Sequence, residues 1–258
     1  MKFYTFGQKE NPAILLLSGT CCHWKTNYEG VIPYLEKDFY VVCVSYDGFD
    51  ETENTVFDNM ISQTEKIEQY VKENFGGKIH TAYGCSMGGS FVGFLVQRKV
   101  IQISHGILGS SDLDQEEGFS AKFKSWLIAK VLHGMFQSGN LPKFFQKRLD
   151  KKDPEMREYM EKMLAMFGVG STKMSFVKKK SIRNQFYSDL ITELEEKISV
   201  PGTTIHVFYA MKMGGQYLER YQKHFVNPDI CEHDLQHEEL LFSYPEKWAE
   251  EVKRVTNL

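Results

Sequence analysis

Residues 78–89 read Lys-Ile-His-Thr-Ala-Tyr-Gly-Cys-Ser-Met-Gly-Gly, and this stretch decides the fold. Its first half predicts a strand, and the small and apolar residues 87–99 predict the helix that follows. Ser86 stands between them in a Gly-x-Ser-x-Gly pattern at the strand–helix junction. A serine in so tight a turn leaves almost no room for side chains two positions away, and glycine there removes the Cβ clash. The pattern therefore predicts that Ser86 is a nucleophile held at a helix N-terminus, which stabilises developing negative charge.

Strands and helices alternate on both sides of this junction, which predicts a parallel sheet with right-handed crossovers. The alternation breaks at 115–198, where no strand pattern is found and Phe, Met and Lys are frequent. We therefore expect an α/β core made of residues 1–114 and 199–258, interrupted by a helical insertion at 115–198. Further strands are expected at 13–18, 39–45, 101–108, 203–209 and 229–233, and further helices at 27–36, 54–74, 214–225 and from about 239.

The composition is that of a soluble globular protein. The 258 residues are 42% apolar and 25% charged, with a net charge of −3, so no global field directs the chain to nucleic acid or to an anionic membrane. Five cysteines, an odd number in mostly apolar contexts, argue against a disulfide framework and for a reducing compartment. The chain shows neither a signal-peptide pattern nor a run of about 18 apolar residues that would suggest a membrane span. We expect a cytoplasmic protein.

Three motifs together resemble the α/β-hydrolase superfamily, over residues 13–112 and 200–255. They are Leu-Leu-Ser-Gly-Thr at 16–20, Gly-Cys-Ser-Met-Gly-Gly at 84–89, and a late His237 followed by Tyr-Pro-Glu-Lys-Trp at 244–248. The resemblance implies an eight-stranded, mostly parallel sheet, a helical cap over the active site and a Ser–His–acid triad. It does not specify a substrate, because the fold hosts many activities.

The resemblance also implies where the other catalytic groups stand. The base follows the last strand, where His237 and His233 are the candidates; His237, just before an acidic helix start, is favoured. Their spacing of four residues would suit a metal on a helix, but the segment reads as strand and loop, so no metal is expected. The oxyanion hole would be formed by the N–H groups of Met87, after the nucleophile, and of Thr20, in the loop after the first central strand.

The acid departs from the family pattern. The family usually carries it after the penultimate strand, but here residues 207–215 contain no carboxylate, and the next one is Glu219. A smaller group of these enzymes carries the acid one strand earlier, where this chain has Asp112. The order Ser86, Asp112, His237 agrees with the family's chain order, so Asp112 is the predicted acid. The alternatives are Asp114, Asp234 and Glu238, and Asp112 could instead be a helix cap.

The insertion supplies many apolar side chains, among them Trp126, Phe136, Phe145, Met163 and Met166, and a basic run, Lys-Lys-Lys at 178–180. In one interpretation, the apolar side chains line a cap that binds an acyl chain, and the basic run lies near an anionic group of the substrate. In the other, the apolar side chains form the core between the helices and the basic run is a solvated surface.

The leading hypothesis is a serine hydrolase that cleaves a small ester or thioester through an acyl-enzyme, without cofactor or metal. The alternatives are a degenerate hydrolase that binds a ligand or partner, and an acyltransferase. A small-molecule substrate is the expected partner, nucleic acid is not, and the sequence specifies no oligomeric state.

Overall fold

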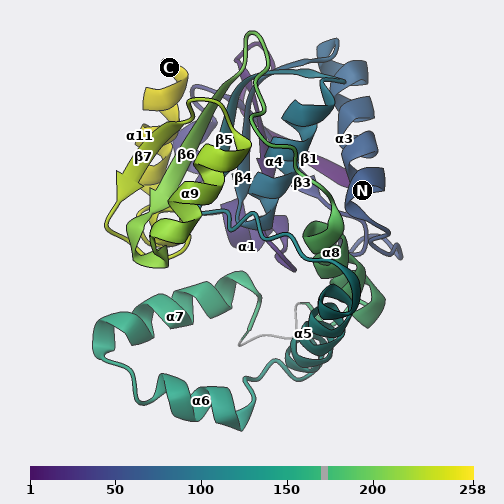
Figure 1. The fold of residues 1–258 in the computed structure, drawn as a ribbon, viewed down its shortest axis with the longest axis vertical. Helices are drawn as coiled ribbons and strands as arrows, with labels where there is room; N and C mark the ends of the chain where they lie inside the picture. The colour runs from purple at the N-terminus through teal and green to yellow at the C-terminus, as the bar shows by residue number, and fades with distance from the viewer. Residues whose placement is uncertain (170–173) are drawn as a thin grey trace.

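A computed structural model describes residues 1–169 and 174–258 and shows one central sheet between two layers of helices (Figure 1). Seven strands are found in these residues, in the order β1-β3-β2-β4-β5-β6-β7. The strands are β1 (Lys2–Phe6), β2 (Ala13–Leu17), β3 (Tyr40–Ser45), β4 (Lys78–Cys85), β5 (Gln102–Gly109), β6 (Thr204–Ala210) and β7 (Asp229–His233). The α/β class and the parallel sheet are confirmed.

The strand count differs from what the family resemblance implied, whereas the mostly parallel sheet agrees with it. The described residues hold seven strands, not eight, and β1 pairs antiparallel with β3 while every other neighbouring pair is parallel. β1 was not predicted from the sequence, because an edge strand that is only partly buried lacks the continuous apolar run of a central strand. The central β2, by contrast, is buried at all five positions, as its apolar run predicts.

Helices cover both faces of the sheet. Apolar residues of α3 (Met60–Phe75), α4 (Met87–Arg98) and α9 (Gly215–His224) pack on one face. Those of α1 (Trp24–Tyr28), α2 (Ile32–Leu35), α10 (Glu239–Ser243) and α11 (Pro245–Thr256) pack on the other. The expected helix 27–36 is in fact two short helices, and the closing helix is divided at Pro245. The helix expected from 54 begins only at Met60, because Asn59 caps it through the N–H of Ser62.

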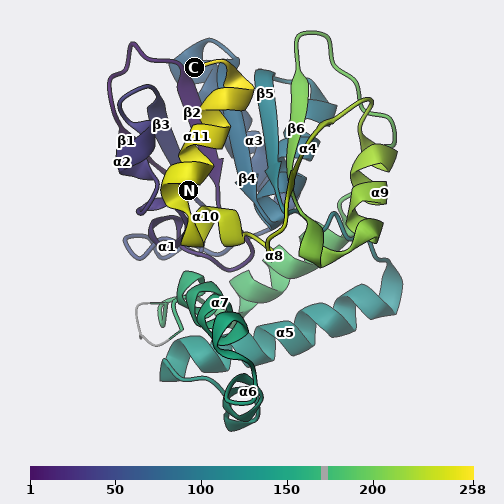
Figure 2. The ribbon, with the colours of Figure 1, turned by 90° about the vertical axis from the view of Figure 1, so that its left-hand side faces the viewer.

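The described residues between β5 and β6, where the insertion was expected, form four helices: α5 (Gly118–Ser138), α6 (Lys143–Leu149), α7 (Pro154–Met166) and α8 (Lys179–Ile191). They lie together beyond one end of the sheet, below it in both views (Figures 1 and 2). Here "the inserted helices" means α5 to α8. No helix in the described part of the chain is long and apolar enough to cross a bilayer.

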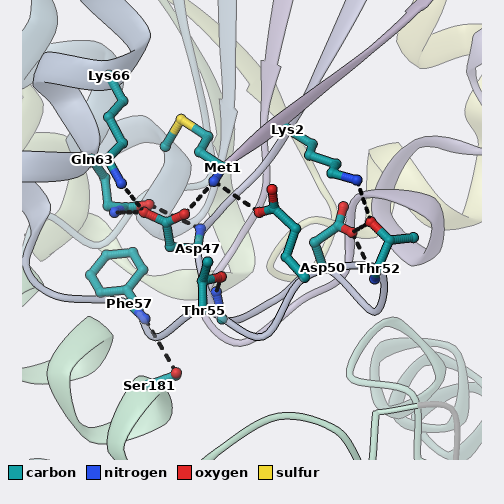
Figure 3. Close-up of polar contacts among 12 residues, drawn as sticks. Met1, Lys2, Asp47, Asp50, Thr52, Thr55, Phe57, Gln63, Lys66 and Ser181 are labelled. Carbon is teal, nitrogen blue, oxygen red and sulfur yellow. Dashed lines mark hydrogen bonds and ion pairs between the residues drawn. The ribbon is translucent and has the colours of Figure 1, made fainter.

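Hydrogen bonds tie α8 to the loop after β3 (Figure 3). The N–H of Phe57 donates to the Ser181 hydroxyl at 3.2 Å, and that of Met60 donates to the Ser188 hydroxyl at 3.1 Å. In the same loop, the buried Asp47 carboxylate accepts from Gln63 at 2.7 Å and also pairs with Lys66 and the N-terminal amine. One of the inserted helices is therefore fixed to the core, close to the edge at which the parallel strands end.

Candidate active site

The junction between β4 and α4 has the strained geometry that its sequence predicts. Ser86 has φ 50° and ψ −116°, a conformation that few residues other than glycine adopt. A Cβ on Gly84 would stand 2.0 Å from the carbonyl carbon of Gly88, and one on Gly88 would stand 2.1 Å from the Leu17 oxygen. Both contacts are with backbone, which cannot move aside. The two glycines are therefore required by the close approach of β2, β4 and α4.

Hydrogen bonds hold the Ser86 backbone from two neighbouring segments. The Ser86 N–H donates to the Gly109 carbonyl at 3.0 Å and to the Glu238 carboxyl at 2.6 Å. The Ser111 hydroxyl donates to the Ser86 carbonyl at 2.6 Å. These bonds come from the end of β5 and from the loop after β7, so both segments fix the position of the serine.

Ser86 opens into a cavity of about 450 Å³, which is within the usual range for small-molecule sites. The core contributes one wall of this cavity and the inserted helices the rest, with mostly apolar side chains. The lining residues are Gly19, Thr20, Cys22, Cys85, Ser86 and His237 from the core, and Leu127, Ile128, Val131, Leu132, Phe145, Met163, Met166, Phe167 and Phe186 from the insertion.

His237 lines this cavity together with Ser86, whereas His233 does not. His233 belongs to β7, packs edge-on against Phe208, and has its Nε2 atom 4.0 Å from a Glu251 oxygen. Burial lowers the pKa of His233, whereas the negative charge of Glu251 acts to raise it. Of the two late histidines, only His237 thus shares a cavity with the serine.

The two residues predicted to form the oxyanion hole both stand near Ser86. Met87 is the first residue of α4, where an N–H has no acceptor within its own helix. Thr20 lines the cavity in the loop after β2. Asn27 and Gln185 hold that loop, accepting from the Gly19 N–H at 2.9 Å and the Cys21 N–H at 2.7 Å. The sequence analysis missed both side chains, because neither spacing nor residue type distinguishes a buried amide that binds a loop from a solvated one.

The cysteines near the site fit the expected packing role. All five cysteines are buried and none forms a disulfide. Burial raises the pKa of Cys22 to about 12 and also raises that of Cys85, so these two cavity-lining thiols remain protonated near neutral pH. A protonated thiol is a poor nucleophile. Neither thiol is therefore suited to act as a nucleophile in this cavity.

Asp112 follows β5 at the same sheet edge as Ser86. Arg220 donates to the Asp112 main-chain oxygen at 2.6 Å and pairs with the Asp114 carboxylate. Burial raises the pKa of Asp112, and the Asp114 charge adds to this effect. Asp112 does not cap α5, whose N-cap residue is Glu117. Among the described residues, no hydrogen bond joins the imidazole of His237 to Asp112 or to the three alternative carboxylates.

Glu238 plays a part that the sequence did not reveal. It is buried, adopts φ 55°, and accepts from the Tyr83 hydroxyl at 3.0 Å as well as from the Ser86 N–H. Burial raises its pKa, against the lowering effect of the neighbouring His237. In the sequence it reads as one of two acids at a helix start. Only the structure shows that it links the loop of His237 to the junction between β4 and α4.

Comparisons with known proteins agree on the fold. No family model matches the chain. Over 96 residues, 36% of this chain and 28% of the other, it is 29% identical to the monoacylglycerol lipase abhd6-B of Xenopus laevis, so the match spans less than a third of that protein. An alpha/beta hydrolase family protein from Desulfitobacterium hafniense matches with a TM-score of 0.79 at 16% identity, covering 98% of this chain and 99% of that one. An enol-lactonase from Burkholderia xenovorans matches with a TM-score of 0.70 at 15% identity, covering 100% and 96%.

The resemblance found in the sequence is thus confirmed at the level of the fold: this chain has the α/β-hydrolase fold along essentially its whole length.

Proposed function

We propose that this protein is a serine hydrolase that cleaves a small ester or thioester through an acyl-enzyme intermediate. The observation that carries the proposal is the position of Ser86, on a strained strand–helix junction, in the same apolar cavity as His237. The similar proteins include a lipase and an enol-lactonase, whose names agree with hydrolytic chemistry at an acyl group.

In the proposed mechanism, the Ser86 hydroxyl attacks the substrate carbonyl while His237 accepts its proton. The N–H groups of Met87 and Thr20 bind the oxyanion, and the leaving group departs with the proton from His237. Water, deprotonated by His237, then attacks the acyl-enzyme and releases the acid and free Ser86. Each step uses groups that line the cavity or stand at the first turn of α4.

We propose Asp112 as the acid that orients His237. Its support is its place directly after β5, at the sheet edge where Ser86 stands, and the fact that Arg220 binds its main-chain oxygen rather than its carboxylate. Glu238 is less suited to this role, because its carboxyl already accepts from the Ser86 N–H and the Tyr83 hydroxyl.

The inserted helices are proposed to form a cap, residues 115–198, whose apolar side chains receive the acyl group. α5 alone contributes Leu127, Ile128, Val131 and Leu132 to the wall of the cavity. Five buried and unpaired cysteines support the cytoplasm as the place of action.

Two other activities fit the same residues. A degenerate hydrolase would bind a ligand without turnover, and it is favoured by the absence, in the described residues, of a hydrogen bond between a carboxylate and His237. An acyltransferase would use the same acyl-enzyme but pass the acyl group to an acceptor other than water.

Hydrolysis of p-nitrophenyl esters from acetate to longer acyl chains, and of an acyl thioester, tests the proposal. Wild type should turn over at least one of them, and Ser86→Ala should lower kcat/KM by roughly 10⁴-fold or more while the circular dichroism spectrum is unchanged. Ser86→Ala with wild-type turnover would contradict the proposal. Release of p-nitrophenol that depends on an added alcohol or thiol, with the acyl group recovered on that acceptor and not as free acid, would instead identify the acyltransferase.

A further inference from the structure

The charge of this chain is divided very unevenly. Residues 118–152, which contain α5 and α6, carry eight Lys or Arg and one Asp, whereas the rest of the chain carries 23 Lys or Arg and 33 Asp or Glu. All eight basic side chains are exposed. The net charge of −3 therefore conceals a strongly basic segment on an acidic protein, and the expectation drawn from net charge alone does not hold for this segment.

The same segment exposes most of the large aromatic side chains on the surface. Phe119 is 82% exposed, Phe123 52% and Trp126 43% on α5, and Phe144 is 59% and Phe145 43% exposed on α6. Only two other aromatic residues among the described ones, Tyr34 and Tyr244, are exposed. Apolar surface gathered in this way marks an interaction site rather than random exposure. We refer to residues 118–152 as the basic aromatic face.

Aromatic and basic side chains alternate on this face. The Phe119, Phe123 and Trp126 rings stack in a row along α5, with successive centroids 6.2 and 6.1 Å apart. The Lys130 ammonium lies 5.5 Å from the Trp126 ring, and the Arg148 guanidinium 4.3 Å from the Phe144 ring. Rings beside cations suit a boundary between apolar and anionic layers, where each ring can be buried while the charge faces the anion.

The face adjoins the entrance of the catalytic cavity. Leu127 and Phe145 are 44% and 43% exposed, and both also line the cavity that contains Ser86. A second hollow of about 560 Å³, between α6 and α7, shares Phe145 and is lined by Arg148, Lys151 and Lys152 beside apolar residues. In both ribbon views α6 lies at the end of the molecule farthest from the sheet, where it can meet a flat surface (Figures 1 and 2).

We propose that the basic aromatic face docks on an anionic phospholipid surface, with the cavity entrance toward the lipid. The cations would contribute roughly 1 kcal/mol each near an anionic leaflet, and the aromatic side chains would enter the interface. An acidic protein would satisfy the cations but would not require a row of exposed aromatic rings beside them. Such docking needs no membrane-spanning helix. The docking does not depend on turnover. Only the delivery of an acyl substrate to Ser86 rests on the proposed function.

Sedimentation with vesicles tests the docking directly. Wild type should bind vesicles of phosphatidylcholine mixed with phosphatidylglycerol, should bind pure phosphatidylcholine far less, and should be released as salt rises. Ser86→Ala should bind as wild type does, so a failure of the hydrolase proposal leaves this test intact. No binding of wild type to the mixed vesicles at low salt would overturn the docking.

Two sets of variants locate the surface. Lys122→Gln, Lys143→Gln and Lys147→Gln together should weaken binding roughly 100-fold, from about 1 kcal/mol for each charge. The matched control, Lys9→Gln, Lys37→Gln and Lys99→Gln, removes three exposed lysines of the core and should change binding by less than about twofold. An equal loss in both triple variants would contradict the assignment to this face.

Phe119→Ser with Phe123→Ser separates a lipid from an acidic macromolecule. Neither side chain lines the cavity, so hydrolysis of a short water-soluble ester should stay at the wild-type rate. Binding to mixed vesicles should fall roughly 10-fold or more, because apolar side chains no longer enter the lipid. Unchanged vesicle binding in this double variant would show that charge alone binds, and would overturn the proposed insertion into lipid.

Discussion

The nucleophile junction and the inserted helices differ in how closely their atoms are packed. Around Ser86, two glycines have no room for a Cβ, and buried carboxyl and hydroxyl groups fix the serine backbone. On α5 and α6, large aromatic side chains stand in solvent beside lysines. The first region is suited to holding reacting groups to within fractions of an ångström, and the second to contacting variable apolar partners. Under the two proposals, the chemistry belongs to the core and substrate delivery to the inserted helices.

If the chemistry belongs to the core alone, the largest losses should come from core residues. His237→Ala should lower kcat/KM by roughly 10⁴-fold or more, almost as much as the loss of Ser86, because nucleophile and base act as a unit. His233→Ala is the matched control and should retain most activity, since His233 does not line the cavity. Ester hydrolysis by both variants checks this. An inactive His233→Ala with an active His237→Ala would show that the base is misplaced.

Replacement of the proposed triad acid, Asp112, should cause the next largest loss of activity. Asp112→Asn should lower kcat roughly 10³- to 10⁴-fold with KM little changed, as when a triad loses the group that orients its histidine. Asp114→Asn, two residues away, should be far milder, because Asp114 pairs with Arg220 at the surface. Steady-state kinetics of the two variants decide the question. Normal turnover in Asp112→Asn would remove Asp112 from the mechanism and favour Glu238→Gln as the next variant.

Stability should distinguish the two regions as sharply as activity does. Gly84→Ala should destabilise the protein by about 3 kcal/mol or more, since its Cβ would stand 2.0 Å from backbone atoms of Gly88. Phe119→Ser on α5 should change the free energy of unfolding by less than about 0.5 kcal/mol, because the side chain is 82% exposed. Urea unfolding of both variants measures this. Equal losses would mean that the inserted helices are as tightly packed as the core.

The parts of the molecule that follow from short-range patterns were predictable from the sequence. Buried strands are continuous apolar runs, so β2, β3, β5 and β6 were found, as was the junction at Ser86. The half-buried β1 and the breaks between α1 and α2 and between α10 and α11 were not predicted, because local periodicity does not show pairing at a sheet edge or short helical breaks.

Residues of the candidate site were predictable from the sequence only where they stand in a short local motif. Ser86, His237 and Thr20 all line one cavity, and their catalytic roles stay predictions. The buried contacts of Glu238, Gln185 and Asn27 join segments far apart in the chain, and no single sequence encodes such pairings visibly. The basic aromatic face was also missed, since a helix stripe of rings and lysines looks the same whether it is core, cavity wall or open surface.

Labelling with a fluorophosphonate, followed by peptide mapping, tests the central claim most directly. The reagent reacts covalently only with an activated serine nucleophile, so it does not depend on knowing the substrate. Wild type should carry one adduct, on the peptide that contains Ser86, and Ser86→Ala should carry none. His237→Ala should label far more slowly, because the base is missing. A stable adduct on another residue, or a folded wild-type protein that remains unlabelled, would contradict the assignment of Ser86 as the nucleophile of a hydrolase.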